Sequence, residues 1–409
     1  MNTYAVIVLV ALLTEYGVQL VADLLNLKGL RADLPPEFRD TYDVERYDRS
    51  QAYTREKTTF GIATSTFDLA VVLLFWFVGG FAWLDGLVRG VGSSPIVTGL
   101  LYIGALAVAR TLLGVPFSWY STFVIEERWG FNKTTAGTFW ADRAKGLVLA
   151  LVLGGPLLAA ILWFFESTGA SAWIWCWGIT ALFTVVVQFV APTWIMPLFN
   201  RFEPLEDGEL RQRVLAYAEG VEFPLEGMFV IDGSRRSTKA NAFFTGFGKR
   251  KRVALFDTLI EKHEPEELVA IVAHEIGHYK LKHILKGLLL SLLQLGVVFF
   301  LLSVFLKHSG LFEAFGVATP SVYAGLIFFS LLYAPIDLVL SFLMHAFSRK
   351  NEFEADRFAR ETTGSGERLA VALKRLSADT LSNLTPHPFY VLLHYSHPPV
   401  LQRIRALRA

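Results

Sequence analysis

Long apolar runs alternate with polar stretches along this chain. Seven runs are apolar over enough residues to cross the roughly 30 Å of hydrocarbon in a bilayer, which predicts seven transmembrane helices. These runs span residues 4–26, 65–88, 95–118, 146–166, 171–193, 286–307 and 322–346. The polar stretches 194–285 and 347–409 are large enough to form one domain together. The pattern therefore predicts a multipass α-helical membrane protein with a discontinuous polar domain.

The helices and the polar stretches divide the chain into four parts. Residues 1–193 hold helices one to five with their loops, and 286–346 hold helices six and seven. The two polar stretches, 194–285 and 347–409, form the first and second parts of the polar domain. We expect this domain to be fused to the membrane helices, because helices six and seven separate its parts.

Composition agrees with a membrane protein and limits the other chemistry. The chain is 53% hydrophobic, with a mean hydropathy of +0.43, which is more than a soluble domain of this length usually carries. A net charge of +1 gives no sign of a nucleic-acid partner. The single cysteine, Cys176, excludes an internal disulfide framework and a thiolate metal site. A bound metal must therefore be held by histidine and carboxylate.

Basic residues are concentrated in alternate connections between the predicted helices. The connection 27–64 has seven Lys and Arg, and 119–145 has four. The opposite connections hold only Arg89 and Lys307. By the positive-inside rule the amino terminus faces out, and both parts of the polar domain face the cytoplasm.

Several charged or amide side chains are predicted at or near membrane depth, where contact with lipid would be costly. They are Glu15, Asp23, Asp68, Arg110, Gln188 and Asp337. Two interpretations stay open: pairing between helices or at the headgroups, and a wet interior chamber.

The segment His274-Glu275-Ile276-Gly277-His278 carries the clearest chemistry. On a helix, residues i and i+4 share a face, so both imidazoles can bind one Zn²⁺ while Glu275 addresses a water on the same metal. This arrangement is typical of peptide-bond hydrolysis. Gly277 would keep the helix slim where metal and substrate approach.

A catalytic zinc needs a third protein ligand and one open position for water. The segment 351–356, just after helix seven, offers three carboxylates. On a helix, Glu352 and Asp356 face the same way, whereas Glu354 points elsewhere. We therefore predict Glu352 as the third ligand of one zinc ion per chain, and Asp356 as an acceptor that orients a ligand imidazole.

Short elements are predicted around this motif. Residues 209–220 predict a helix, and 228–232 a short strand. Two extended runs, 240–247 and 252–256, flank a glycine and basic turn. Together they predict a small sheet with an edge beside the metal-binding helix, which gives the polar domain a zincin-like character.

The order of these motifs resembles the CAAX prenyl protease 1 family of integral-membrane zinc endopeptidases. The resemblance rests on His-Glu-x-x-His, on Glu-Phe-x-Ala-Asp at 352–356 and on His-Tyr-Ser-His-Pro-Pro at 394–399. It extends to Glu126–Thr135 and to Asn241–Phe247, and so covers most of the chain. The resemblance implies seven helices around a water-filled chamber, and it implies the same ligands and the same base, Glu275.

The resemblance also implies roles outside the metal ligands. In the family the tail motif lies beside the metal, so His397 and Arg403 are candidates for stabilising the oxyanion. His387 and His394 are weaker candidates, and His283 points off the ligand face. The edge strand at Asn241 and Ala242 would bind an extended peptide by strand addition.

The predicted function is hydrolysis of peptide bonds in membrane-proximal peptides or in prenylated carboxy termini. The expected partners are a peptide or protein substrate, with or without a lipid, and membrane lipids. The membrane is either the bacterial inner membrane or the endoplasmic reticulum. One alternative is a quality-control protease for membrane proteins. Another is a transporter or receptor with a structural zinc, although no internal halves are visible.

Overall fold

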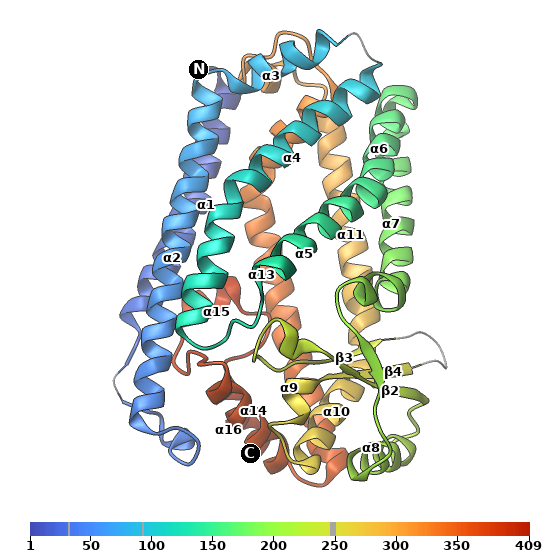
Figure 1. Ribbon diagram of the computed structural model, residues 1–409. Coiled ribbons are helices and arrows are strands. Elements are labelled where there is room, and N and C mark those ends of the chain that lie inside the picture. Colours follow the sequence, from blue (N-terminus) through green and yellow to red (C-terminus); the bar gives the residue numbers. More distant parts are fainter. Residues whose placement is uncertain (32, 92–93, 246–250) are drawn as a thin grey trace.

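The computed structural model describes residues 1–31, 33–91, 94–245 and 251–409 of the chain. Among these residues, seven helices are long and apolar enough to cross a membrane, which confirms the predicted number. They are α1 (Thr3–Lys28), α2 (Val44–Phe77), α4 (Pro95–Tyr120, continuing to Glu126), α5 with α6 (Ala136–Leu149 and Gly155–Ser167), α7 (Ala172–Val190), α11 (His283–Phe305) and α13 (Val322–Thr363). In Figure 1 they run between an end that carries the amino terminus and an end that carries the carboxy terminus.

Two of the predicted helices differ from the structure in where they are divided or where they end. The predicted run 65–88 is divided at Gly79, whose φ of 78° ends α2 and starts the short helix α3 (Gly80–Arg89). Helix α13 does not stop where its apolar run stops, but continues as one 42-residue helix to Thr363. Its polar last third therefore projects from the membrane part and carries Glu352 and Asp356.

The membrane helices pack loosely. In three of the seven spans only 6% of the most apolar stretch is buried. Of the six polar residues predicted near membrane depth, Asp68, Arg110 and Asp337 are exposed, and the other three are half-buried. Packing between the helices therefore does not cover Asp68, Arg110 and Asp337.

A four-stranded sheet lies at the carboxy-terminal end, in the order β1-β2-β4-β3. Its strands are β1 (Phe202–Pro204), β2 (Leu225–Ile231), β3 (Ala242–Thr245) and β4 (Lys251–Phe256). Strands β2 and β4 are parallel, and the other two pairs are antiparallel. The predicted strands are confirmed, and β3 lies at the edge. Residues 246 and 247 of the predicted run 240–247 lie outside the described residues.

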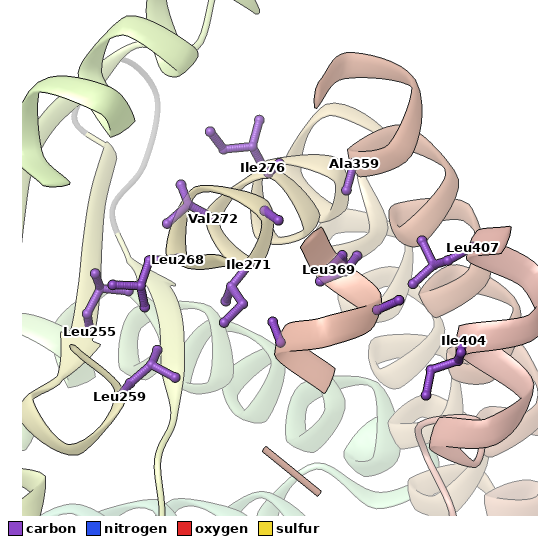
Figure 2. Packing of buried hydrophobic residues seen from close by; sticks show 14 of the residues in the cluster. Leu255, Leu259, Leu268, Ile271, Val272, Ile276, Ala359, Leu369, Ile404 and Leu407 are labelled. Carbon is purple, nitrogen blue, oxygen red and sulfur yellow. The ribbon is translucent and has the colours of Figure 1, made fainter. Parts of the chain in front are cut away.

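Short helices complete this end of the molecule, and most of them contribute to one apolar core. They are α8 (Glu209–Gly220, as predicted), α9 (Asp257–Ile260), α10 (Pro265–Lys280), α14 (Glu367–Asp379), α15 (Pro388–His394) and α16 (Val400–Arg408), while α12 (Ser309–Glu313) lies between α11 and α13. Figure 2 shows Leu268, Ile271 and Val272 of α10 at the centre of the core. The core also includes Phe38 and Tyr42, from the loop between α1 and α2.

Candidate metal centre

Helix α10 presents the two predicted histidines on one face. Pro265 at the first helical position and Glu266 and Glu267 in the first turn are typical of a helix start, because they suit its free N–H groups and positive dipole end. His274 and His278 then lie one turn apart, with their Nε2 atoms 3.2 Å from each other. His274 is buried, and His278 is partly accessible.

Helix α13 brings Glu352 to the same point. Its Oε2 lies 3.4 Å from Nε2 of His274, and its Oε1 lies 3.3 Å from Nε2 of His278. The two helices can approach this closely because of Gly277, where a Cβ atom would lie 3.2 Å from both Cα and O of Ala355. The close approach of α13 therefore requires a glycine at this position. From the sequence alone, we expect only metal and substrate to need this space.

The three side chains have the donor set of a metal site. Their ligand atoms all lie within 4.8 Å of one another. Oε2 of Glu352 is buried and makes no hydrogen bond within the described part of the chain. A buried carboxylate oxygen without a hydrogen bond is costly, so a cation between the two Nε2 atoms and this carboxylate fits the residues present.

Asp356 and Arg403 support the site from behind. Oδ1 of Asp356 lies 2.9 Å from Nδ1 of His274, so that the ring donates there and directs its Nε2 toward Glu352. Arg403, on α16, donates from Nε and Nη2 to both oxygens of Asp356, at 2.8 and 2.7 Å, and its Nη1 lies 3.4 Å from Oε2 of Glu352. Burial opposes protonation of His274, but hydrogen bonds to Asp356 and Glu352 raise its pKa to about 9. A bound metal would replace that proton.

Glu275 and His397 lie close to these residues. Burial raises the pKa of Glu275 above its usual value, against the attraction of His274 and His278. A raised pKa suits a carboxylate that must take up a proton near neutral pH. His397 is exposed, and its Nε2 lies 3.2 Å from Oε1 of Glu352. The structure thus brings together the seven main candidates, which are His274, Glu275, His278, Glu352, Asp356, His397 and Arg403.

Sequence reasoning missed His283 and Glu354 as neighbours of the site. Nδ1 of His283 lies 3.1 Å from Nδ1 of His278, and its Nε2 lies 3.1 Å from Oε2 of Glu354. The helical pattern that sets His283 off the ligand face does not apply, because α10 ends at Lys280 and the chain turns at Lys282, with φ 58°. The signal that could have indicated this contact is a histidine that follows directly after the end of the metal-binding helix.

The remaining predicted histidines have local partners. Nδ1 of His387 accepts a hydrogen bond from the backbone N–H of Phe389 and so caps α15. His394 packs its ring against Tyr390, at 4.4 Å between ring centroids.

The predicted substrate strand lies at the free edge of the sheet, and β3 contacts α10. The carbonyl of Asn241 accepts from the N–H of Phe256, so the main chain of Asn241 faces β4. By the alternation of antiparallel ladders, the main-chain groups of Ala242 then face outward. The Asn241 side chain accepts from the N–H of Ala242, at 2.9 Å.

Seven membrane helices joined to a His-Glu-x-x-His helix with a third carboxylate define an integral-membrane metallopeptidase. Residues 23–201 match the family described as "CAAX prenyl protease N-terminal, five membrane helices", and residues 204–409 match "Peptidase family M48". The chain belongs to the CAAX prenyl protease 1 family of M48 peptidases.

Full-length relatives agree with this assignment. The chain is 35% identical to CAAX prenyl protease 1 homolog of Arabidopsis thaliana, over 97% of this chain and 95% of the relative. It is 35% identical to CAAX prenyl protease 1 of Saccharomyces cerevisiae, over 91% of this chain and 88% of the relative. The crystal structure of S. mikatae Ste24p is similar over 100% of both chains, with a TM-score of 0.95 and 31% identity.

Proposed function

We propose that this metallopeptidase uses one zinc ion to cleave prenylated carboxy-terminal peptides of the CAAX type. The observation that carries the zinc proposal is the convergence of His274, His278 and Glu352 beside Glu275. The names of the relatives support the substrate class, because they are called CAAX prenyl proteases.

His274, His278 and Glu352 would hold the zinc. When bound, zinc polarises the scissile carbonyl and lowers the pKa of a coordinated water to roughly 7. Asp356 keeps the proton on Nδ1 of His274, so that Nε2 stays free as a ligand.

Glu275 acts as the general base. It follows His274 directly on α10 and carries a raised pKa, so it can take the proton of the attacking water and return it to the leaving amine. His397 is exposed beside Glu352, where its ring can donate to the developing oxyanion.

The substrate adds as a strand to β3. The outward main-chain groups of Ala242 pair with the peptide, and the Asn241 amide gives up its hydrogen bond to the Ala242 N–H when the peptide arrives. The metal end of the molecule faces the cytoplasm, of either the bacterial inner membrane or the endoplasmic reticulum.

A Glu275→Gln variant tests this function. Loss of the base should lower cleavage of a farnesylated CAAX peptide by at least about 10²-fold, while zinc content, measured on the purified protein, stays at one per chain. Glu261→Gln makes the same change at an exposed position and should leave both unchanged. Near-normal cleavage by Glu275→Gln would exclude Glu275 as the base.

Metal and substrate are tested separately. His278→Ala and Glu352→Ala should lose zinc, and removal of metal from the wild type by a chelator should abolish cleavage until zinc is restored. Equal cleavage of farnesylated and unmodified peptides would contradict the substrate class and leave the zinc chemistry standing.

A further inference from the structure

Three side chains form a line that leads away from the metal centre. His278 points its Nε2 toward Glu352 and its Nδ1 toward Nδ1 of His283, at 3.1 Å. His283 in turn points Nε2 at Oε2 of Glu354, at 3.1 Å. The His283 side chain is only 3% exposed, so solvent does not replace these contacts.

The contacts allow one arrangement of protons when a metal is bound. A metal takes the lone pair of Nε2 in His278, so the proton of that ring must be on Nδ1. Nδ1 of His283 must then be the acceptor, which puts the proton of the second ring on its Nε2. That N–H donates to Glu354, a carboxylate that only accepts.

We propose that His283 and Glu354 are positioning residues for the metal ligand His278, and that they fix its tautomer and ring orientation through this chain of hydrogen bonds. The proposal rests on the proposed zinc site. Neither residue belongs to the candidate ligand set or to the predicted substrate strand.

The two ligand histidines are thus held by related means. Asp356 accepts directly from His274, whereas Glu354 accepts from His278 through an intervening imidazole. Both carboxylates come from α13, but Glu354 lies on the side of that helix that faces the start of α11. The turn at Lys282 places His283 between His278 and Glu354.

The test measures affinity for Zn²⁺ in the metal-free protein, by competition with a chromophoric chelator. His283→Ala and Glu354→Ala should each weaken zinc binding by roughly 10- to 100-fold, as expected for loss of a group that orients a ligand. Both should still bind one zinc at saturation. His283→Asn, which retains an acceptor oxygen near the position of Nδ1, should recover part of the affinity.

Lys350→Ala is the matched control. Lys350 lies 3.7 Å from the other oxygen of Glu354 and is 73% exposed, so its removal should leave the affinity unchanged. Replacement of zinc by Co²⁺ gives a second measurement, because the visible absorption of the ion reports ligand geometry. The band should shift in His283→Ala and stay unchanged in Lys350→Ala.

Wild-type affinity and an unshifted cobalt band in both His283→Ala and Glu354→Ala would overturn the proposal. Glu354 is 27% exposed, so Glu354→Ala keeps the test decisive if His283→Ala does not fold. Failure of the wild type to bind zinc at all would instead contradict the proposed function.

Discussion

The contacts of Arg403 change the role that was predicted for it. Sequence resemblance made it a candidate for stabilising the oxyanion, but its guanidinium is buried and is shared between Asp356 and Glu352. Donors occupied in this way cannot turn toward a substrate without leaving two buried carboxylates uncompensated. We infer that Arg403 holds the ligand set in place.

Arg403→Gln should therefore lower zinc content and the thermal midpoint together. Breaking a buried charge network by removing one partner costs about 3–5 kcal/mol, whereas loss of an oxyanion donor would lower kcat by about 10²–10³-fold with the metal intact. Zinc analysis and thermal unfolding of the purified variant separate the two roles. His397→Ala serves as the comparison, with zinc retained and kcat reduced.

Ligand spacing within one helix could be predicted, and contacts between elements could not. The i, i+4 rule placed His274 with His278 and Glu352 with Asp356, because both pairs lie on uninterrupted helices. The same rule did not predict the contact between His283, which follows a turn, and Glu354, which lies on a different helix. Such partners depend on how helices cross, which no local pattern encodes.

At the scale of elements, the loop 127–135 holds the segment that leads into β3. Asn132 forms an antiparallel bridge with Ser237, and the N–H of Thr238 donates to the carbonyl of Phe131. Nearby, Nζ of Lys239 lies 2.8 Å from both Glu126 and Tyr53. The motif at 126–135, which the metal chemistry does not use, thus fixes the approach to the edge strand.

Lys239→Met should raise KM for the peptide several-fold, with little change in zinc content or kcat. Loss of the ammonium removes a hydrogen-bond partner of Glu126, which costs about 1–3 kcal/mol of folding stability. It also loosens the strand, which must be ordered to bind substrate. Steady-state kinetics give the two constants, and Lys239→Arg should restore KM. Arg128→Ala, at an exposed ion pair of the same loop, should have no effect. An unchanged KM in Lys239→Met would mean that the edge strand needs no such support.

Hydropathy predicted the membrane helices well but not where they continue. The polar extension of α13 to Thr363 carries no apolar signal, yet it places Glu352 against α10. Likewise, α2 begins at Val44, where the Asp43 side chain accepts from the N–H of Arg46 and caps the helix. Apolar length indicates what the bilayer covers, and caps and packing decide where a helix ends.

At the scale of the whole molecule, the protease core draws on the membrane half. Phe38 and Tyr42 of the first loop are buried in the same core as α10 and α16. Lys374, which is 2% exposed, donates to both oxygens of Asp40 on that loop. The predicted division at residue 193 stays a prediction of domain bounds, and the core crosses it.

Orientation is the prediction that belongs to this scale. In a Cys176→Ala background, Glu209→Cys on exposed α8 should react with a membrane-impermeant maleimide only from the cytoplasmic side of sealed vesicles. Val91→Cys, exposed at the opposite end, should react only from the other side. Labelling of Glu209→Cys from outside would reverse the topology and the proposed route of the substrate.

The order in which the site residues occur along the chain has a consequence for biosynthesis. His274 and His278 precede α11 and α13, whereas Glu352 lies in the polar last third of α13 and Arg403 follows that helix. A ribosome therefore delivers half of the metal centre, then two helices that must enter the bilayer, and only then the other half. A nascent chain still passing through the insertion machinery cannot cleave its neighbours, because its metal centre is complete only after the last two membrane helices have been made and inserted.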